Sequence, residues 1–154
     1  MKKVVFIEKY RFGFDPWGLI LFLMVMLPNF FWFAVHAPND VLRKESLTPI
    51  VDTIGSVFQV LFIACMCLLI NNERSKTDNL PLIIATTASV VLYYISWTLY
   101  YAGITSVWVI LMLTLAPCVA FLLFAIGRKN LPAIIFAICF TICHLIFGIV
   151  NFIV

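Results

Sequence analysis

The chain has 154 residues, of which 64% are hydrophobic and 11% are charged, and its formal net charge is +3. Soluble domains average about 25% charged residues and roughly half apolar residues, so this composition excludes a soluble globular protein. A transmembrane helix needs about 20 mostly apolar residues. The chain therefore has room for five or six such helices with short loops and no separate soluble domain.

Five long apolar stretches predict an all-α integral membrane protein, a single domain built as a bundle of five transmembrane helices. In chain order these stretches cover residues 16–37, 49–70, 80–101, 105–126 and 131–154. Asp15 and Thr48 each place a capping oxygen directly before a proline, which is a typical start of a helix. Runs of this length lack the alternation of barrel strands, so helices are favoured.

The basic residues predict the orientation, because Lys and Arg near the ends of spans are retained on the cytoplasmic side. With the N-terminus inside, eight basic residues fall in cytoplasmic segments, namely Lys2, Lys3, Lys9, Arg11, Arg74, Lys76, Arg128 and Lys129. Only Arg43 and Lys44 then lie outside. We therefore expect a cytoplasmic N-terminus, an extracytoplasmic C-terminus and a multi-pass protein of the plasma (inner) membrane. Orientation in the lipid bilayer accounts for the net charge, so no nucleic-acid partner is expected.

Polar residues recur at helical spacing along four of the five spans. Asp52, Ser56 and Gln59 are four and three residues apart, which places them on one face of a helix. Polar faces in lipid are costly unless they turn toward other helices or water. On the expected topology most of these residues fall in the outer half, so we predict a polar cavity that opens to the extracytoplasmic side. Its predicted ligand-binding residues are Asp52, Ser56, Gln59, Tyr93, Ser96, Tyr100, His144 and Asn151.

Each ionisable candidate has a second interpretation. Asp52 could carry a proton or act as a base, but a carboxylate four residues after Thr48 also complements the positive end of a helix. His144 near mid-membrane is a functional hypothesis, although a neutral histidine bonded to a neighbouring helix needs no further role. The aromatic residues near the span ends are typical of an interfacial belt and could alternatively form a ligand cage: Trp17, Trp32, Trp97, Trp108, Tyr100 and Tyr101.

Cysteine and histidine spacing gives only a weak metal signal. Cys139 and Cys143 are four apart with His144 adjacent, but a fourth ligand is not evident, so we expect neither a metal nor another cofactor. All five cysteines fall inside predicted spans, which implies no extracellular disulfide framework. The HExxH, GxSxG, P-loop and GxGxxG motifs do not occur, and we expect a non-enzymatic role.

These patterns leave three functional hypotheses. The leading one is a protein whose polar cavity binds or transports a small or amphipathic molecule. The alternative is an assembly or accessory membrane subunit, in a homo-oligomer or with a partner membrane protein, whose polar stripes are contacts between helices. The third is a thiol or metal enzyme that uses Cys139, Cys143 and His144.

Overall fold

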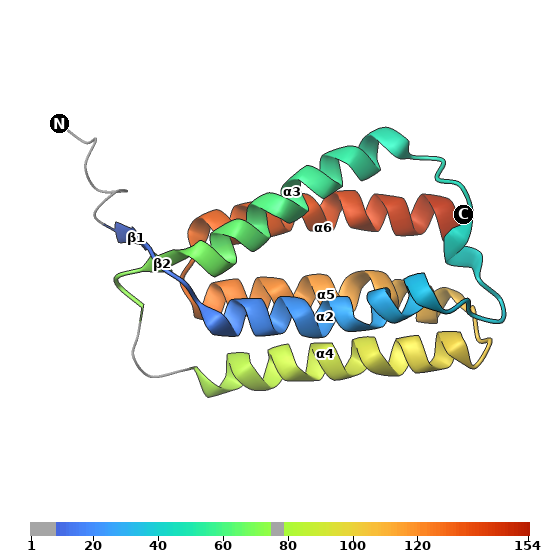
Figure 1. Ribbon diagram of the computed structural model, residues 1–154, viewed down its shortest axis with the longest axis horizontal. Helices are drawn as coiled ribbons and strands as arrows, with labels where there is room; N and C mark the ends of the chain where they lie inside the picture. Colours follow the sequence, from blue (N-terminus) through green and yellow to red (C-terminus); the bar gives the residue numbers. More distant parts are fainter. Residues whose placement is uncertain (1–8, 75–78) are drawn as a thin grey trace.

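The computed structural model describes residues 9–74 and 79–154, and Lys2, Lys3 and Lys76 of the predicted cytoplasmic charge lie outside the described residues. The described part contains five long helices: α2 (Pro16–Ala34), α3 (Pro49–Leu68), α4 (Leu80–Tyr101), α5 (Val107–Gly127) and α6 (Leu131–Phe152). All five are long and apolar enough to cross a membrane. This confirms the predicted class, an all-α polytopic membrane protein, and Figure 1 shows the helices running side by side.

The helices start at the predicted capping residues, but only Asp15 acts as predicted, because Thr48 makes no side-chain capping hydrogen bond. The Asp15 carboxylate accepts a hydrogen bond from the backbone N–H of Trp17 at 3.1 Å, and proline occupies the first turn of α2, α3, α4 and α6. Helix α4 has the predicted bounds. Helix α2 ends at Ala34, earlier than the predicted 37, because Val35 adopts an extended conformation.

Helix α5 lies at the centre of the bundle and packs against both α4 and α6. Some 56% of its most apolar stretch is buried, against 17–22% in the other four helices. The buried alanines Ala116 and Ala120 of α5 and Ala133 and Ala137 of α6 allow helix backbones to approach closely. Helix α3 packs mainly against α6 rather than against α4, its neighbour in sequence. Figure 1 accordingly shows an α3–α6 pair above a group formed by α2, α4 and α5.

Polar contacts fasten α2 to α4. Pro28 has no N–H, so it leaves the carbonyl of Met24 one turn earlier without its helical partner. The Tyr94 hydroxyl donates to that carbonyl oxygen at 2.7 Å. One residue after the proline, Asn29 Nδ2 donates to the Tyr93 hydroxyl at 2.7 Å. The proline in α2 therefore provides the acceptor for one of two hydrogen bonds between these helices.

The two ends of the bundle differ in structure. At one end, which we call the basic end, strands β1 (Tyr10–Phe12) and β2 (Leu69–Asn71) pair antiparallel, with Tyr10 opposite Asn71. At the other, which we call the Asp40 end, a short 3-10 helix, η1 (Val41–Arg43), lies between α2 and α3. Figure 1 places β1 and the C-terminus at opposite ends, as an odd number of spans requires.

Candidate functional site

A pocket of about 220 Å³ lies between α3 and α6 toward the Asp40 end. Four of the predicted ligand-binding residues line it, and they come from two helices far apart in sequence: Asp52, Ser56 and Gln59 from α3 and His144 from α6. Asp52 lies in the first turn of α3. Ser56 and Gln59 follow on the same face, so the polar lining descends roughly 10 Å along the helix from Asp52. The remaining lining residues are Val51, Gly55, Phe140, Cys143 and Phe147.

The pocket combines several polar groups with aromatic walls. The Thr48 hydroxyl donates to Asp52 Oδ1 at 3.0 Å, which orients the carboxylate. The His144 ring stacks against Phe140 and Phe147 at centroid distances of 5.0 and 6.1 Å, both with interplanar angles of 18°. The wall therefore offers a carboxylate, an amide, a hydroxyl and an imidazole next to flat apolar surface.

Gly55 allows α3 and α6 to approach each other behind these groups. A Cβ added at Gly55 would lie 3.1 Å from Cys143 Cβ, which is closer than most such contacts. A larger residue would separate the two helices at this level. The width of the pocket therefore depends on a glycine that the polar spacing alone does not identify.

The other four predicted site residues contact another segment of the bundle or their own helix. Buried Tyr93 accepts from Asn29, and the Ser96 hydroxyl donates to the Leu92 carbonyl of its own helix at 2.8 Å. Tyr100 is fully buried, and its hydroxyl donates to Asp40. None of these three lines the α3–α6 pocket.

Asn151 lies next to the pocket and is linked to Asp52 through Thr48. Its Nδ2 donates to Thr48 Oγ1 at 2.9 Å, and Thr48 in turn bonds Asp52. Its Oδ1 accepts from the backbone N–H of Leu47 at 2.5 Å. Asn151 therefore fastens the end of α6 to the start of α3 beside the pocket, without lining it.

Asp40 organises a hydrogen-bonded cluster that the sequence did not reveal. Its Oδ1 accepts from Trp32 Nε1 at 2.8 Å and from the Tyr100 hydroxyl at 2.9 Å, while Oδ2 accepts from Arg43 Nε at 2.7 Å. Burial raises the pKa of this carboxyl, but the hydrogen bonds from Trp32, Arg43 and Tyr100 outweigh it and hold the pKa below its ordinary value. The cluster ties the loop after α2 to α4.

The interpretation of the terminal aromatics as one interfacial belt is therefore wrong for some of them. Trp17 and Trp108 fit a belt, since they are 61% and 74% exposed. Trp97 and Tyr100 are 6% and 0% exposed and belong to the core. Position near a span end did not distinguish the two groups, because it says nothing about which side of the helix faces lipid.

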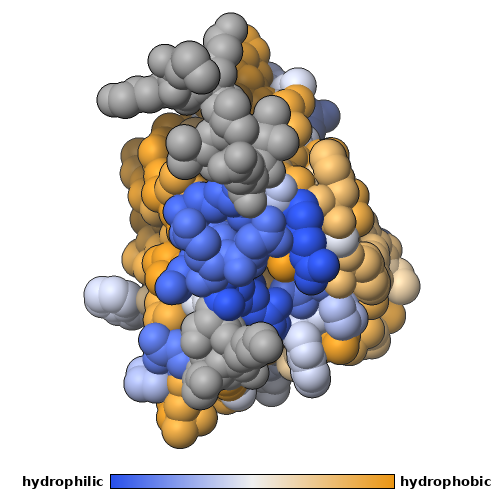
Figure 2. Space-filling model, turned by 90° about the vertical axis from the view of Figure 1, so that its left-hand side faces the viewer, coloured by the Kyte–Doolittle hydropathy of each residue, from blue (hydrophilic) through white to orange (hydrophobic). Residues whose placement is uncertain are grey.

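A second polar cluster closes the basic end. Asp15 is only 5% exposed, and its Oδ2 lies 3.0 Å from Arg128 Nε and 3.2 Å from Arg74 Nη1. Asn130 is also buried, and its Nδ2 donates to the carbonyls of Cys65 and Leu69. Figure 2 shows hydrophilic residues gathered at the centre of this end, with hydrophobic surface at the sides. The sequence pattern predicted Asp15 only as a helix cap.

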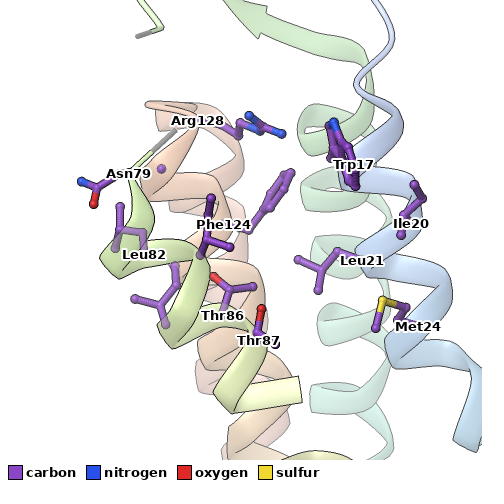
Figure 3. Close-up of a pocket in the computed structure, with 13 residues that line it drawn as sticks. Trp17, Ile20, Leu21, Met24, Asn79, Leu82, Thr86, Thr87, Phe124 and Arg128 are labelled. Carbon is purple, nitrogen blue, oxygen red and sulfur yellow. The ribbon is translucent and has the colours of Figure 1, made fainter. Parts of the chain in front are cut away.

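A larger groove of about 380 Å³ lies beside this cluster, between α2, α4 and α5. Figure 3 shows Leu21 and Met24 of α2 across from Thr86 and Thr87 of α4, with Phe124 of α5 between them. Arg128 and Trp17 lie at the same end of the groove. The complete lining is Trp17, Ile20, Leu21, Met24, Asn79, Leu82, Ile83, Thr86, Thr87, Leu123, Phe124, Gly127 and Arg128.

Cys139, Cys143 and His144 gave a weak metal signal in the sequence, and the structure does not arrange them as a metal site. All five cysteines are free thiols. Within residues 9–74 and 79–154, no group of three or more His, Cys, Asp or Glu side chains is arranged to hold a metal ion. Cys143 lines the α3–α6 pocket next to His144, where it contributes to the wall.

The fold and these sites define a polytopic membrane protein that carries a small polar pocket between two of its helices. Searches against known protein families, curated proteins and solved structures find no match to this chain.

Proposed function

We propose that this membrane protein binds a small molecule in the pocket between α3 and α6, in a non-enzymatic role of capture or transport. The observation that supports this most is that Asp52, Ser56, Gln59 and His144 line one pocket although they come from two separate helices. Placing polar side chains within the membrane costs free energy, and their gathering in one polar pocket is explained if they bind a ligand there. A pocket with a few convergent polar groups in apolar walls is the usual form of a ligand site.

The lining favours a ligand with a hydrogen-bond donor or a positive charge at one end. The Asp52 carboxylate attracts such a group, and the aromatic faces of Phe140 and Phe147 suit either an apolar body or a cation. The volume of 220 Å³ is below the range of roughly 300–1,000 Å³ for drug-sized ligands. We therefore propose a small amphipathic amine or amide as the ligand class.

The proposed route of entry follows from the charge distribution. If the basic end is cytoplasmic, as the positive-inside rule predicts, the pocket lies in the extracytoplasmic half of the membrane. Asp52, in the first turn of α3, would then be the first pocket residue that a ligand from outside meets. His144 and Gln59 would contact the ligand deeper in the membrane.

Native mass spectrometry of the mildly extracted protein tests this proposal, because it shows bound small molecules and subunit count together. We expect a reproducible non-lipid adduct on the wild-type protein. Ser56→Phe fills the pocket and should remove the adduct. Val57→Phe is the matched control, since Val57 is the next residue along α3, is 55% exposed and does not line the pocket.

Three outcomes would count against the proposal. A wild-type protein without any adduct would contradict it, as would an adduct that persists in Ser56→Phe. Loss of the adduct in both variants would show that the pocket is not its site.

A second candidate function is an assembly or accessory membrane subunit. The observation that favours it is that Tyr93, Tyr100 and Asn151 form contacts between segments of the bundle instead of lining the pocket. Polar contacts between membrane helices average about 0.6 kcal/mol, so such residues need no ligand. A bare homo-oligomer or a stable complex with a second membrane protein in the same spectrum would favour this function.

A further inference from the structure

The groove between α2, α4 and α5 has the features of a site for one lipid chain. Its wall is formed mainly by apolar side chains, including Ile20, Leu21, Leu82 and Leu123. The lining on this side runs from Asn79, the residue before α4, to Thr87, which corresponds to about 12 Å along a helix. Its volume of 380 Å³ falls within the usual range for ligand pockets, roughly 300–1,000 Å³.

The charge at the end of the groove is positive. Arg128 lines the groove, its guanidinium lies over the Phe124 ring at 4.8 Å, and its side chain is 13% exposed. Asp15 compensates only part of the local charge. At the basic end the described residues include five basic and two acidic side chains: Lys9, Arg11, Arg74, Arg128, Lys129, Asp15 and Glu73. An anionic headgroup complements this excess.

We propose that the groove binds one anionic phospholipid, with an acyl chain along the α2–α4 gap and the phosphate at Arg128. Arginine suits this position because its planar guanidinium can present two donors to phosphate oxygens. Trp17 lies at the same end of the groove, as Figure 3 shows, and its indole suits the level of lipid headgroups. This site is separate from the α3–α6 pocket and does not depend on the proposed function.

Quenching of tryptophan fluorescence by lipids with brominated chains tests the proposal in detergent micelles. Two probes with the same brominated chains are compared, an anionic phosphatidylglycerol and a zwitterionic phosphatidylcholine. We expect saturable quenching by the anionic lipid at an about fivefold lower mole fraction, the preference that one basic residue near a membrane surface provides. Trp17→Phe should remove most of this headgroup-selective quenching, because Trp17 is the reporter that lines the groove.

Two further variants distinguish lipid binding in the groove from general contact between the protein and lipid. Thr87→Phe fills the groove without changing a charge and should abolish the selective quenching. Thr98→Phe is the matched control, since Thr98 is an exposed threonine of the same helix outside the groove. Its fluorescence should be quenched as in the wild type. Equal curves for the two lipids would overturn the proposal. Unchanged selectivity in Thr87→Phe would overturn it as well, and circular dichroism checks that each variant is folded.

Discussion

Replacing Asp15 should destabilise the bundle far more than replacing an exposed acidic residue at the same end. The side chains of Asp15 and Arg128 are 6% and 13% exposed, so the ion pair between them is largely shielded from water. Removing one partner of a buried pair costs about 3–5 kcal/mol, and partial exposure of Arg74 reduces the penalty here. We therefore expect Asp15→Asn to cost about 2–4 kcal/mol. Asp15→Ala should cost about 1 kcal/mol more, because it also removes the cap on Trp17 N–H.

Unfolding by sodium dodecyl sulfate in mixed micelles, followed by circular dichroism, measures these differences in the free energy of unfolding. Glu73→Gln is the matched control. Glu73 pairs with Lys9 at 3.0 Å at the same end, but the two side chains are 65% and 39% exposed. Little change is expected there, since exposed ion pairs contribute little. Equal effects of Asp15→Asn and Glu73→Gln would show that burial does not make the Asp15 cluster more stabilising than an exposed ion pair.

Substitutions at three further contacts are measured by the same assay. Asp40→Asn should cost about 1–3 kcal/mol at neutral pH. Because the pKa of Asp40 is lowered in the folded state, this contribution should begin to fall below about pH 4 and vanish once the folded protein binds the proton at still lower pH. A difference that does not shrink as the pH falls through this range would contradict the assignment. Gly148→Ala should cost about 1–3 kcal/mol, since its Cβ would lie 2.7 Å from Thr114 Oγ1, and Thr114→Ala should restore part of the loss. Tyr93→Phe should cost only about 0.6 kcal/mol, because Asn29 keeps its bond to the Val25 carbonyl.

The number and approximate bounds of the helices were predictable because length and hydrophobicity determine them. Which helices pack against one another was not predictable. The sequence contains no signal that α3 packs against α6, since lipid-facing and helix-facing apolar residues have similar composition. Strand β2 was also missed, because Leu69 and Ile70 continue the apolar run of α3 and differ from it only in backbone conformation.

Helical spacing predicted part of the candidate site. It placed Asp52, Ser56 and Gln59 on one face, and these three residues do line one pocket. The same spacing grouped Tyr93 with Tyr100, which are both buried on α4, but it could not show that this face meets α2 and the Asp40 loop. Spacing defines a face within one helix, and the packing of helices decides what that face contacts.

The cluster at the basic end could have been predicted from the charged residues that flank the spans, which helical spacing within the spans does not take into account. Asp15, Arg74 and Arg128 flank three different spans, and the charge rule already placed all three at one side of the membrane. One carboxylate between two arginines on the same side predicts an ion pair. Charged residues in loops can therefore indicate ion pairs as well as orientation.

The reactivity of a cysteine placed in the α3–α6 pocket tests whether this pocket is open to water. In a protein whose five native cysteines are replaced by alanine, Ser56→Cys is compared with Val57→Cys in a membrane-impermeant thiol reagent. The two positions lie at the same depth, but only Ser56 lines the pocket. We expect Ser56→Cys to react from the predicted extracytoplasmic side, whereas lipid should protect Val57→Cys. An unreactive Ser56→Cys, or equal reaction at both positions, would contradict a water-accessible polar pocket between these helices.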